Sequence, residues 1–335
     1  MTNPRPLLVD RPPPSLASIQ EPVEERLEAV KEEIRRIVLS DFHRIEEVND
    51  YLLLMRGKLF RPTLLLLVDG LDGTPDEEAV SLAAVVELVH LATLVHDDAV
   101  DHSVLRRGLP TVNALWTHQV AIIMGDYLYS RSVMELARLG NMEAVRSLAR
   151  ASNSMSQGEM RQLTSYDALD FNEEDYYQLI ACKTASLMEA ACEMGALGGG
   201  EEHRRRMAAF GHDLGMAFQI ADDLLDYTGS KEETGKPTGH DLRERKVTLP
   251  LVEALRRVSK PQGETIRTFF TRVDPSEEEI QEVVEIVREA RGLEYAEAKA
   301  REFASRARAG LSGLPQNPYL EQLLAAVDYA VERTR

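Results

Sequence analysis

Residues 79–101 read AVSLAAVVELVHLATLVHDDAVD, a long apolar run that ends in the acidic triplet Asp97-Asp98-Ala99-Val100-Asp101. A second apolar run, LGMAFQIADDLLD at residues 214–226, ends in a triplet of identical spacing, Asp222-Asp223-Leu224-Leu225-Asp226. Runs that are apolar around most of a helix are typical of central helices in a bundle. We therefore expect an all-α bundle in which two buried helices end in carboxylates that face each other across one deep central cavity.

The rest of the chain supports a helical fold. Apolar residues recur at intervals of three and four, while alternating, strand-like runs are scarce. The pattern predicts one all-α domain over residues 23–335, preceded by a flexible, proline-rich tail over residues 1–22. We expect helices over residues 23–40, 43–53, 61–68, 77–102, 113–139, 142–163, 173–197, 203–226, 249–257, 264–271, 277–291 and 293–311.

Composition excludes several classes of protein. The chain has 335 residues, of which 44% are hydrophobic, so it can bury a large core. A formal net charge of -17 argues against non-specific nucleic-acid binding, which needs a basic surface. No stretch reaches the roughly 18 uncharged apolar residues of a transmembrane segment. The two cysteines, Cys182 and Cys192, lack metal-ligand spacing, and we interpret them as reduced core residues of a cytoplasmic protein.

The two triplets predict a metal site. The first and fifth residues of such a pattern lie one turn apart on the same helix face, so Asp97 can act with Asp101 and Asp222 with Asp226. One triplet alone would be a solvated helix face. Two triplets that both follow apolar runs place six acids where uncompensated charge is costly. Carboxylates with room for waters and phosphate oxygens are what Mg²⁺ accepts, so we expect a magnesium-bound diphosphate.

Cations precede and follow the first triplet. Lys58 and Arg61, three residues apart, suit a terminal diphosphate, although they could also form an exposed helix start. His90 lies two helical turns before the first acid and is a buried structural histidine unless a phosphate is near. Arg106 and Arg107 follow the triplet and could each serve one phosphate, or belong to an ordinary charged loop.

More polar residues accompany the second triplet. Lys183 and Thr184 lie in a helix rich in alanine and methionine, where a lysine is hard to explain as surface decoration. Gln219 precedes the second triplet by three residues and can hydrogen-bond a ligand or a metal-bound water. Lys236 and Lys246 bracket a glycine-containing segment that can fold over phosphates, or that is a mobile linker.

With these motifs the chain resembles the trans-isoprenyl diphosphate synthases, also called polyprenyl synthetases, from about Gly57 to Pro250 and again at its C-terminal end. The resemblance implies a bundle around a deep cavity, a homodimer, and three Mg²⁺ held between the two triplets. It implies direct metal ligation by Asp97, Asp101 and Asp222, with support from Asp98, Asp223 and Asp226.

The resemblance also assigns the cations. Isopentenyl diphosphate would be bound by Lys58, Arg61, His90 and Arg107, and the allylic diphosphate by Arg106, Lys183, Lys236 and Lys246, with Thr184 and Gln219 nearby. One residue departs from the family pattern: Arg245 stands where glycine is more common, which bears on the geometry of Lys246.

Product length follows from the residues below the first triplet. A growing tail would pass Ala92 and Thr93, one turn earlier on the helix, and both side chains are small. Short-chain members of the family commonly carry a bulky aromatic there, so the resemblance implies a long-chain product of five or more isoprene units. Leu88, Val89 and, across from them, Val133 would set the floor of the passage.

Other functions stay open at this point. A geranylgeranyl or farnesyl diphosphate synthase would share every motif. A class I terpene cyclase shares the fold and the first triplet, but usually carries a different second metal motif and does not need the isopentenyl-binding cations. A non-catalytic subunit of a heteromeric prenyltransferase tends to lack some of the acids or cations, all of which are present here.

Overall fold

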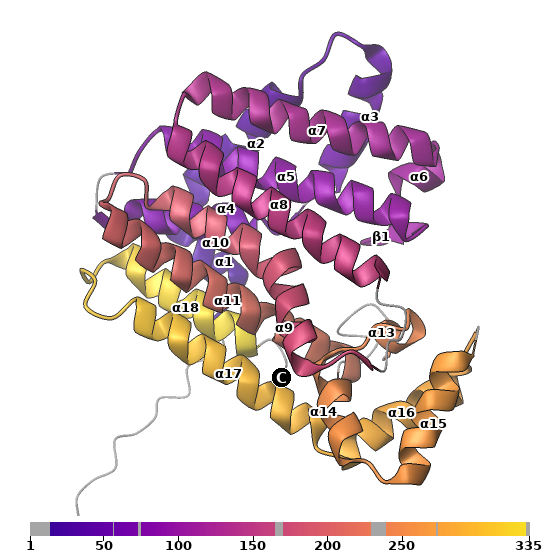
Figure 1. Cartoon of the computed structure of the whole chain (residues 1–335). Coiled ribbons are helices and arrows are strands. Elements are labelled where there is room, and N and C mark those ends of the chain that lie inside the picture. The colour runs from indigo at the N-terminus through magenta and orange to yellow at the C-terminus, as the bar shows by residue number, and fades with distance from the viewer. Residues whose placement is uncertain are drawn as a thin grey trace, which may run out of the picture.

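Helix α5 (Glu78–Val100) lies at the centre of the main bundle in the computed structural model, which describes residues 14–55, 57–72, 75–164, 170–228, 239–272 and 274–332. It packs against α2 (Glu24–Val38), α4 (Phe60–Asp69), α7 (His118–Leu139) and α10 (Ser186–Gly195), as Figure 1 shows. By length and composition α5 could cross a membrane, but most of it is buried among these helices, as in a core helix. The expected all-α fold is confirmed.

The bundle continues around a second long helix. Helix α11 (Glu201–Thr228) packs against α10 and against α17 (Gly292–Gly310). The other elements are α1 (Leu16–Gln20), η1 (Glu21–Val23), α3 (His43–Leu54), η2 (Gly70–Asp72), the short hairpin β1 (Leu105–Arg106) and β2 (Leu109–Pro110), α6 (Val112–Leu115), α8 (Met142–Thr164), α9 (Glu173–Ile180), the π-helical segment η4 (Ala181–Ala185), α13 (His240–Arg243), α14 (Leu249–Arg257), α15 (Lys260–Thr271), α16 (Glu277–Glu289) and α18 (Pro318–Glu332).

The N-terminal boundary of order differs from the expectation. Residues 14–22 were expected to belong to the flexible tail, but Leu16–Gln20 forms a helix whose Ile19 is completely buried. The amide Nε2 of Gln20 donates hydrogen bonds to the carbonyl of Lys58 at 2.9 Å and to Oγ1 of Thr63 at 3.0 Å. This segment therefore packs onto the loop that carries Lys58, and residues 1–13 of the expected tail lie outside the described residues.

Helix boundaries depart from the expectation in two more places. The helix expected over residues 113–139 is divided at Trp116, because the side chain of Thr117 accepts a hydrogen bond from the backbone N–H of Val120 and starts α7. Helix α18 was not predicted, although its apolar residues follow a helical period and Asn317 caps its start by accepting from Leu320. The helix expected over 173–197 forms as α9, η4 and α10.

Two glycines place η4 between its neighbours. A Cβ on Gly158 of α8 would lie 2.8 Å from Cβ of Cys182, and one on Gly215 of α11 would lie 2.6 Å from Cα of Ala185. Side chains at these positions would force α8 and α11 away from η4. A π-helical turn inside a helix is rare and often marks a functional site. Here it carries Lys183 and Thr184 into the space between α8 and α11.

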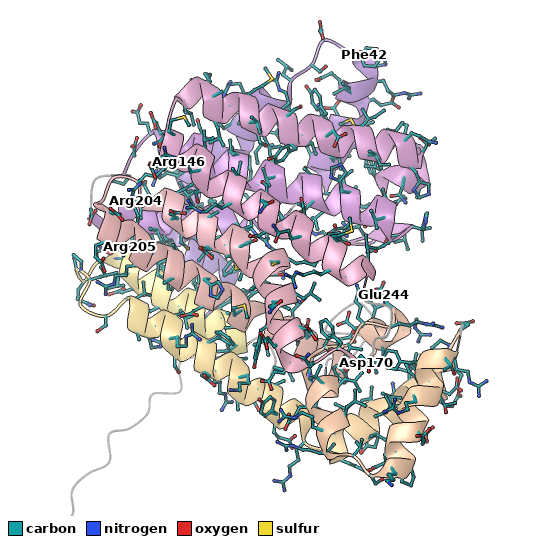
Figure 2. The ribbon with its side chains drawn as sticks, in the orientation of Figure 1. Phe42, Arg146, Asp170, Arg204, Arg205 and Glu244 are labelled. Carbon is teal, nitrogen blue, oxygen red and sulfur yellow. The ribbon has the colours of Figure 1, made fainter. Side chains whose placement is uncertain are left out.

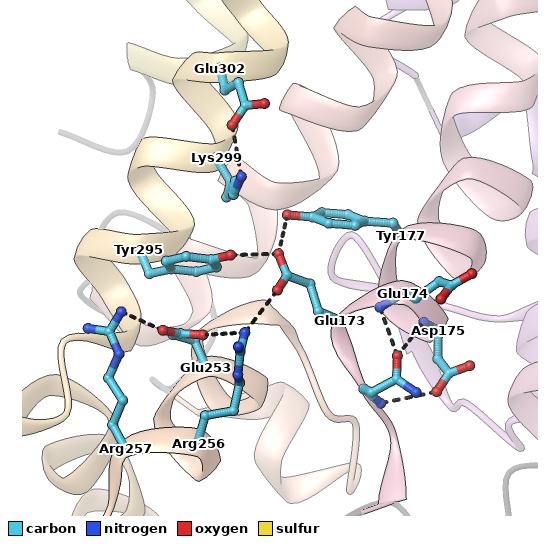
Figure 3. Close-up of polar contacts among 11 residues, drawn as sticks. Glu173, Glu174, Asp175, Tyr177, Glu253, Arg256, Arg257, Tyr295, Lys299 and Glu302 are labelled. Atoms are coloured by element: carbon cyan, nitrogen blue, oxygen red, sulfur yellow. Dashed lines mark hydrogen bonds and ion pairs between the residues drawn. The ribbon is translucent and has the colours of Figure 1, made fainter.

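The C-terminal helices α14 to α16 build a second apolar core together with Tyr227 of α11 and Leu242 of α13. Figure 1 shows this group beside one end of α17. Glu173 links it to the main bundle, because its carboxylate accepts hydrogen bonds from Tyr295 at 2.7 Å and Tyr177 at 2.9 Å and pairs with Arg256 at 3.3 Å (Figure 3). Burial and this carboxylate raise the pKa of Tyr295 to about 12, so the phenol remains a donor.

The close approach at Gly215 generates a stability prediction. In Gly215→Ala the new methyl group meets the backbone of Ala185, and overpacking of this kind costs about 1–3 kcal/mol, more than the helix propensity that alanine gains. We expect urea unfolding to give a lower free energy of unfolding. Gly310→Ala in α17 is the control, since its Cβ would make only ordinary contacts, and an equal loss there would contradict the explanation.

Candidate active site

The carboxyl ends of α5 and α11 lie on one side of the bundle, where α5 leads to β1 and α11 leads toward α13 (Figure 1). Lys246 acts on acids at both ends, because its charge offsets part of the rise that burial causes in the pKa of Asp101 after the first helix and of Asp241 after the second. That the two triplets face a shared space stays a prediction.

In the first triplet the middle acid has a different partner from its neighbours. Asp98 is buried and accepts hydrogen bonds from Nε and Nη2 of Arg106 at 2.7 and 2.9 Å. Burial raises the pKa of Asp97 to about 6, an effect that Lys183 opposes. Burial likewise raises the pKa of Asp101. Asp98 thus orients Arg106, while Asp97 and Asp101 carry charge that the protein compensates incompletely.

The second triplet divides in a similar way. Asp223 is buried and accepts hydrogen bonds from the hydroxyl of Tyr176 at 2.6 Å and from Nε2 of Gln219 at 2.8 Å. The carbonyl oxygen of Gln219 accepts in turn from Thr184 at 2.7 Å. Asp226 accepts from the backbone N–H of residues 240 and 241, both at 3.0 Å, and so fixes the start of α13. Asp222, the remaining acid, is exposed.

Within the described residues, no three His, Cys, Asp or Glu side chains already converge as a metal-binding group. The reason is visible in the contacts above, because Asp98, Asp223 and Asp226 are each held by protein donors. The resemblance names Asp97, Asp101 and Asp222 as direct ligands, and burial raises the pKa values of Asp97 and Asp101. Their oxygen atoms form the kind of donor set that suits a hard divalent cation.

Lys246 and its surroundings include an acid that the sequence analysis missed. Nζ of Lys246 pairs with Glu244 at 2.6 Å, and although burial opposes its charge, this hydrogen bond and the nearby acids raise its pKa. Asp241 lies beside the second triplet, and burial together with Asp226 raises its pKa to about 6. The signal for Asp241 was its place within the glycine-containing segment that Lys236 and Lys246 bracket, and Lys236 itself lies outside the described residues.

A second cationic group lies on the other side of the first triplet. Arg61, His90 and Arg107 influence one another, and burial together with the two arginines lowers the pKa of His90 well below its usual value. Nε of Arg61 is buried without a hydrogen-bond partner among the residues described. Glu87 belongs to this group. Burial raises its pKa, and the charges of Arg61 and Arg107 offset part of that rise. The sequence analysis overlooked Glu87, although it is the one acid within an apolar stretch of α5.

Gly57 allows the loop before α4 to lie over this group. A Cβ at Gly57 would come within 2.7 Å of Oε1 of Glu87. The next residue, Lys58, is exposed, so its ammonium group remains accessible at the edge of the cluster.

Left-handed backbone conformations gather around the same groups. Among the described non-glycine residues, positive φ occurs at Leu59, His102, Arg107, Arg245 and Arg291, and the first four of these adjoin or belong to the predicted site. Such strain clusters at functional sites. Arg245 has φ 59°, which explains why glycine suits this position in the family and shows that Lys246 is presented by a strained turn.

The residues predicted to control product length divide into two groups. Leu88, Val89 and Ala92 are buried in α5, and Thr93 is partly exposed one turn before Asp97. The prediction for Val133 is wrong, because its side chain is 44% exposed on the outer face of α7, opposite the residues that pack on α5. Spacing alone could not show which face of α7 packs on α5, since both faces of that helix carry apolar residues.

A cavity of about 440 Å³ lies elsewhere, between α8, α10, α11 and α17. Its lining is mostly charged and includes Arg150, Glu189, Glu193, His212 and Arg306. Charged walls are unsuitable for a hydrocarbon chain, so this cavity is not the predicted product passage.

Comparison with known proteins identifies the family. Residues 42–287 match the family model for polyprenyl synthetase. The chain is 34% identical to the octaprenyl diphosphate synthase of Escherichia coli, over 96% of this chain and all of that one. It is 37% identical to heptaprenyl diphosphate synthase component 2 of Geobacillus stearothermophilus, over 87% of this chain and 90% of that one.

A solved structure extends the likeness to three dimensions. The polyprenyl synthase of Caulobacter crescentus, solved with calcium and isoprenyl diphosphate, is 33% identical and superimposes with a TM-score of 0.90, covering 97% of this chain and all of that one. Fold, motifs and overall length all agree, and the chain therefore belongs to the polyprenyl synthetase family of prenyltransferases.

Proposed function

We propose that this enzyme condenses isopentenyl diphosphate, head to tail and in trans, with an allylic diphosphate to give a polyprenyl diphosphate of five or more isoprene units. The observation that carries the proposal is the occurrence of two acidic helix ends, at Asp97 and Asp222, together with cations that act on the first triplet and with the buried group of Arg61, His90 and Arg107. Its relatives in Escherichia coli and Geobacillus stearothermophilus are named as octaprenyl and heptaprenyl synthases, which supports a long product.

The carboxylates fit a divalent metal. Asp97 and Asp101 have raised pKa values because burial penalises their charge, so a bound cation would relieve a real electrostatic cost. We propose that they and Asp222 hold three Mg²⁺. When bound, these ions would neutralise the diphosphate as it leaves the allylic carbon. Asp98, Asp223 and Asp226 orient Arg106, Gln219 and α13 around them.

Two groups of cations would each bind one of the two substrates. Lys58, Arg61, His90 and Arg107 would bind isopentenyl diphosphate, and the low pKa of His90 keeps its ring neutral, so it contributes a hydrogen bond instead of charge. Arg106, Lys183, Lys236 and Lys246 would bind the allylic diphosphate. Arginine forks onto phosphate oxygens in a fixed geometry, and the two carboxylate oxygens of Asp98 fix that geometry for Arg106.

The remaining tasks fall to apolar side chains. Residues such as Ala92, Val89 and Leu88 exclude water from the allylic carbon after the diphosphate departs. The isopentenyl double bond attacks that carbon, and the proton lost afterwards passes to the released pyrophosphate, so no dedicated protein base is required. A class I terpene cyclase is disfavoured because it has no use for the group around Arg61, and a non-catalytic subunit is disfavoured because no acid of either triplet is missing.

The direct test is to incubate the purified protein alone with Mg²⁺, isopentenyl diphosphate and farnesyl diphosphate and to measure product mass. A ladder that ends at five or more units supports the proposal. Cyclic hydrocarbons would indicate a cyclase. A product that stops at four units would indicate a short-chain synthase, because the farnesyl starter already has three. No product without an added partner would indicate a heteromeric subunit.

Asp97→Asn should abolish most turnover while the fold persists. Loss of one metal ligand removes several kcal/mol of charge stabilisation, so we expect kcat to fall by about a hundredfold or more. Circular dichroism checks the fold. The neutral amide should also raise stability in the absence of metal, since the folded protein holds the carboxyl at a pKa of about 6 against a usual value of 3.8.

The sign of that stability effect depends on pH. A pKa raised in the folded state means that ionising Asp97 disfavours folding as pH rises from about 4 to 6. In EDTA, the free energy of unfolding of Asp97→Asn should therefore be higher than that of wild type at pH 8, and the difference should disappear near pH 4. Mg²⁺ should stabilise wild type more than the variant, and equal stabilisation of both would argue against ligation by Asp97.

Ala92→Phe should shorten the product. Ala92 is 2% exposed and lies about one turn below Asp97, so a phenyl ring would fill the start of the proposed passage. Mass spectrometry should show products displaced toward fewer isoprene units. Ala92→Ser, which keeps the small side chain, should leave the ladder unchanged, and an unchanged ladder in the phenylalanine variant would place the tail on another route.

We also propose a homodimer in the cytoplasm. The outer face of α7 exposes Ile122, Ile123, Tyr129, Val133 and Met134, a larger apolar stripe than an isolated subunit usually leaves in water. Figure 1 shows α7 along one edge of the bundle, where a second copy can pack against it.

The state of the cysteines fits the proposed compartment. The two cysteines are free, and burial raises the pKa of Cys192, as expected for an unreactive core thiol.

Val133→Glu should weaken this dimer, because a carboxylate in an apolar interface must be desolvated without a partner. Analytical ultracentrifugation should show a shift toward monomer, whereas Val133→Ile should sediment as wild type does. A wild-type protein that sediments as a monomer at micromolar concentration would contradict the proposal.

A further inference from the structure

We propose that Glu159 is a positioning residue for Lys183: it holds the lysine ammonium between the two acidic helix ends, ready for the allylic diphosphate, and keeps it from occupying Asp97. This inference rests on the proposed function. Glu159 is not a member of either acidic triplet, and it reaches the site from α8, which carries none of the acids or cations assigned to the site so far.

The contacts of Lys183 carry the first step. Its Nζ forms an ion pair with Oε2 of Glu159 and donates a hydrogen bond to Oε1 of Gln162 at 2.9 Å. Glu159 and Gln162 are three residues apart on α8 and so lie on one face of that helix. A lysine ammonium has three N–H donors, so the hydrogen bond to Gln162 and the ion pair with Glu159 hold it against α8 and leave donor capacity for a ligand oxygen.

The backbone fixes this arrangement. Lys183 belongs to the π-helical turn η4, and Gly158, next to Glu159, allows close contact, because a Cβ there would lie 2.9 Å from Cγ of Lys183. Both side chains of the pair are only partly exposed, 26% for Lys183 and 21% for Glu159. Side chains placed by adjoining backbones lose little further freedom when a ligand binds.

The surroundings of the pair supply the reason for an additional acid. Lys183 and Glu159 both lie close enough to Asp97 and Asp101 for their charges to act on them. Without Glu159, the hydrogen bond to Gln162 would be the one contact described above that holds the ammonium on α8, and the lysine could turn toward Asp97 before metal and diphosphate arrive.

The test is Glu159→Gln, which keeps the shape of the side chain and removes its charge. A hydrogen bond to a charged group contributes about 1.5–3 kcal/mol, so KM for the allylic diphosphate should rise about tenfold or more. KM for isopentenyl diphosphate should change less than twofold, and half-saturation with Mg²⁺ should require more metal because Lys183 now competes for Asp97. Glu159→Asp should restore part of the loss.

Two further variants separate positioning from general damage. Glu143→Gln neutralises another acid of α8, which pairs with Arg146 and Arg204, labelled in Figure 2 at the other end of the bundle from Glu244 beside Lys246. It should behave as wild type. Lys183→Gln combined with Glu159→Gln should be no worse than Lys183→Gln alone, since Glu159 acts only through the lysine.

Binding of Mg²⁺ with inorganic pyrophosphate, measured by calorimetry, gives a readout that does not need turnover. Glu159→Gln should bind pyrophosphate about tenfold more weakly than wild type. If wild type binds pyrophosphate but makes no prenyl product, the proposed function fails. The inference is then tested by whether Glu159→Gln binds pyrophosphate more weakly than wild type. Equal binding by both proteins, an unchanged KM for the allylic substrate, or independent effects in the double variant would each overturn it.

Discussion

The structure depends on placing carboxylates at the ends of two long core helices, where Asp98 and Asp223 are buried and the other four aspartates are partly or fully exposed. Six aspartates close α5 and α11, and Asp241 and Glu159 increase the local negative charge. Within the protein, Arg106, Lys183 and Lys246 offset only part of this charge, since the pKa values of Asp97, Asp101 and Asp241 remain raised. The fold therefore holds an electrostatic cost that a divalent metal with its diphosphate can relieve, which links metal binding to the placement of substrate.

The surrounding hydrogen bonds give different structural roles to acids that look equivalent in sequence. Asp98 holds Arg106, Asp223 is held by Tyr176 and Gln219, and Asp226 starts α13. Each triplet thus contains acids that organise the protein beside acids that we propose as metal ligands. These supporting acids also connect to residues outside the triplets. Asp226 holds the start of α13, which precedes Lys246, and Asp223 accepts from Gln219, which in turn accepts from Thr184 on the π-helical turn. Substitution of a supporting acid would disturb a cation or a helix start as well as the charge.

The sequence predicted the fold class, the two acidic helix ends and the cations around them, because apolar periodicity and repeated motifs depend on local chain geometry. It did not predict Glu87, Asp241 or Glu159, whose roles arise from contacts between helices distant in sequence. Val133 was misplaced because α7 is apolar on two faces, one toward α5 and one outward. The π-helical turn also escaped prediction, since it depends on two glycines in neighbouring helices.

The short helix α1 ties the beginning of the chain to substrate binding. Through Gln20 it supports the carbonyl of Lys58, directly before the left-handed Leu59 and the start of α4. A truncation that removes only the residues before Glu21 would take away this brace while leaving every acid and cation named at the site, and the helices that pack on α5 and α11, in place. An enzyme shortened in that way would present a less rigid platform at Lys58, so affinity tags and truncations should spare the residues from Ser15 onward.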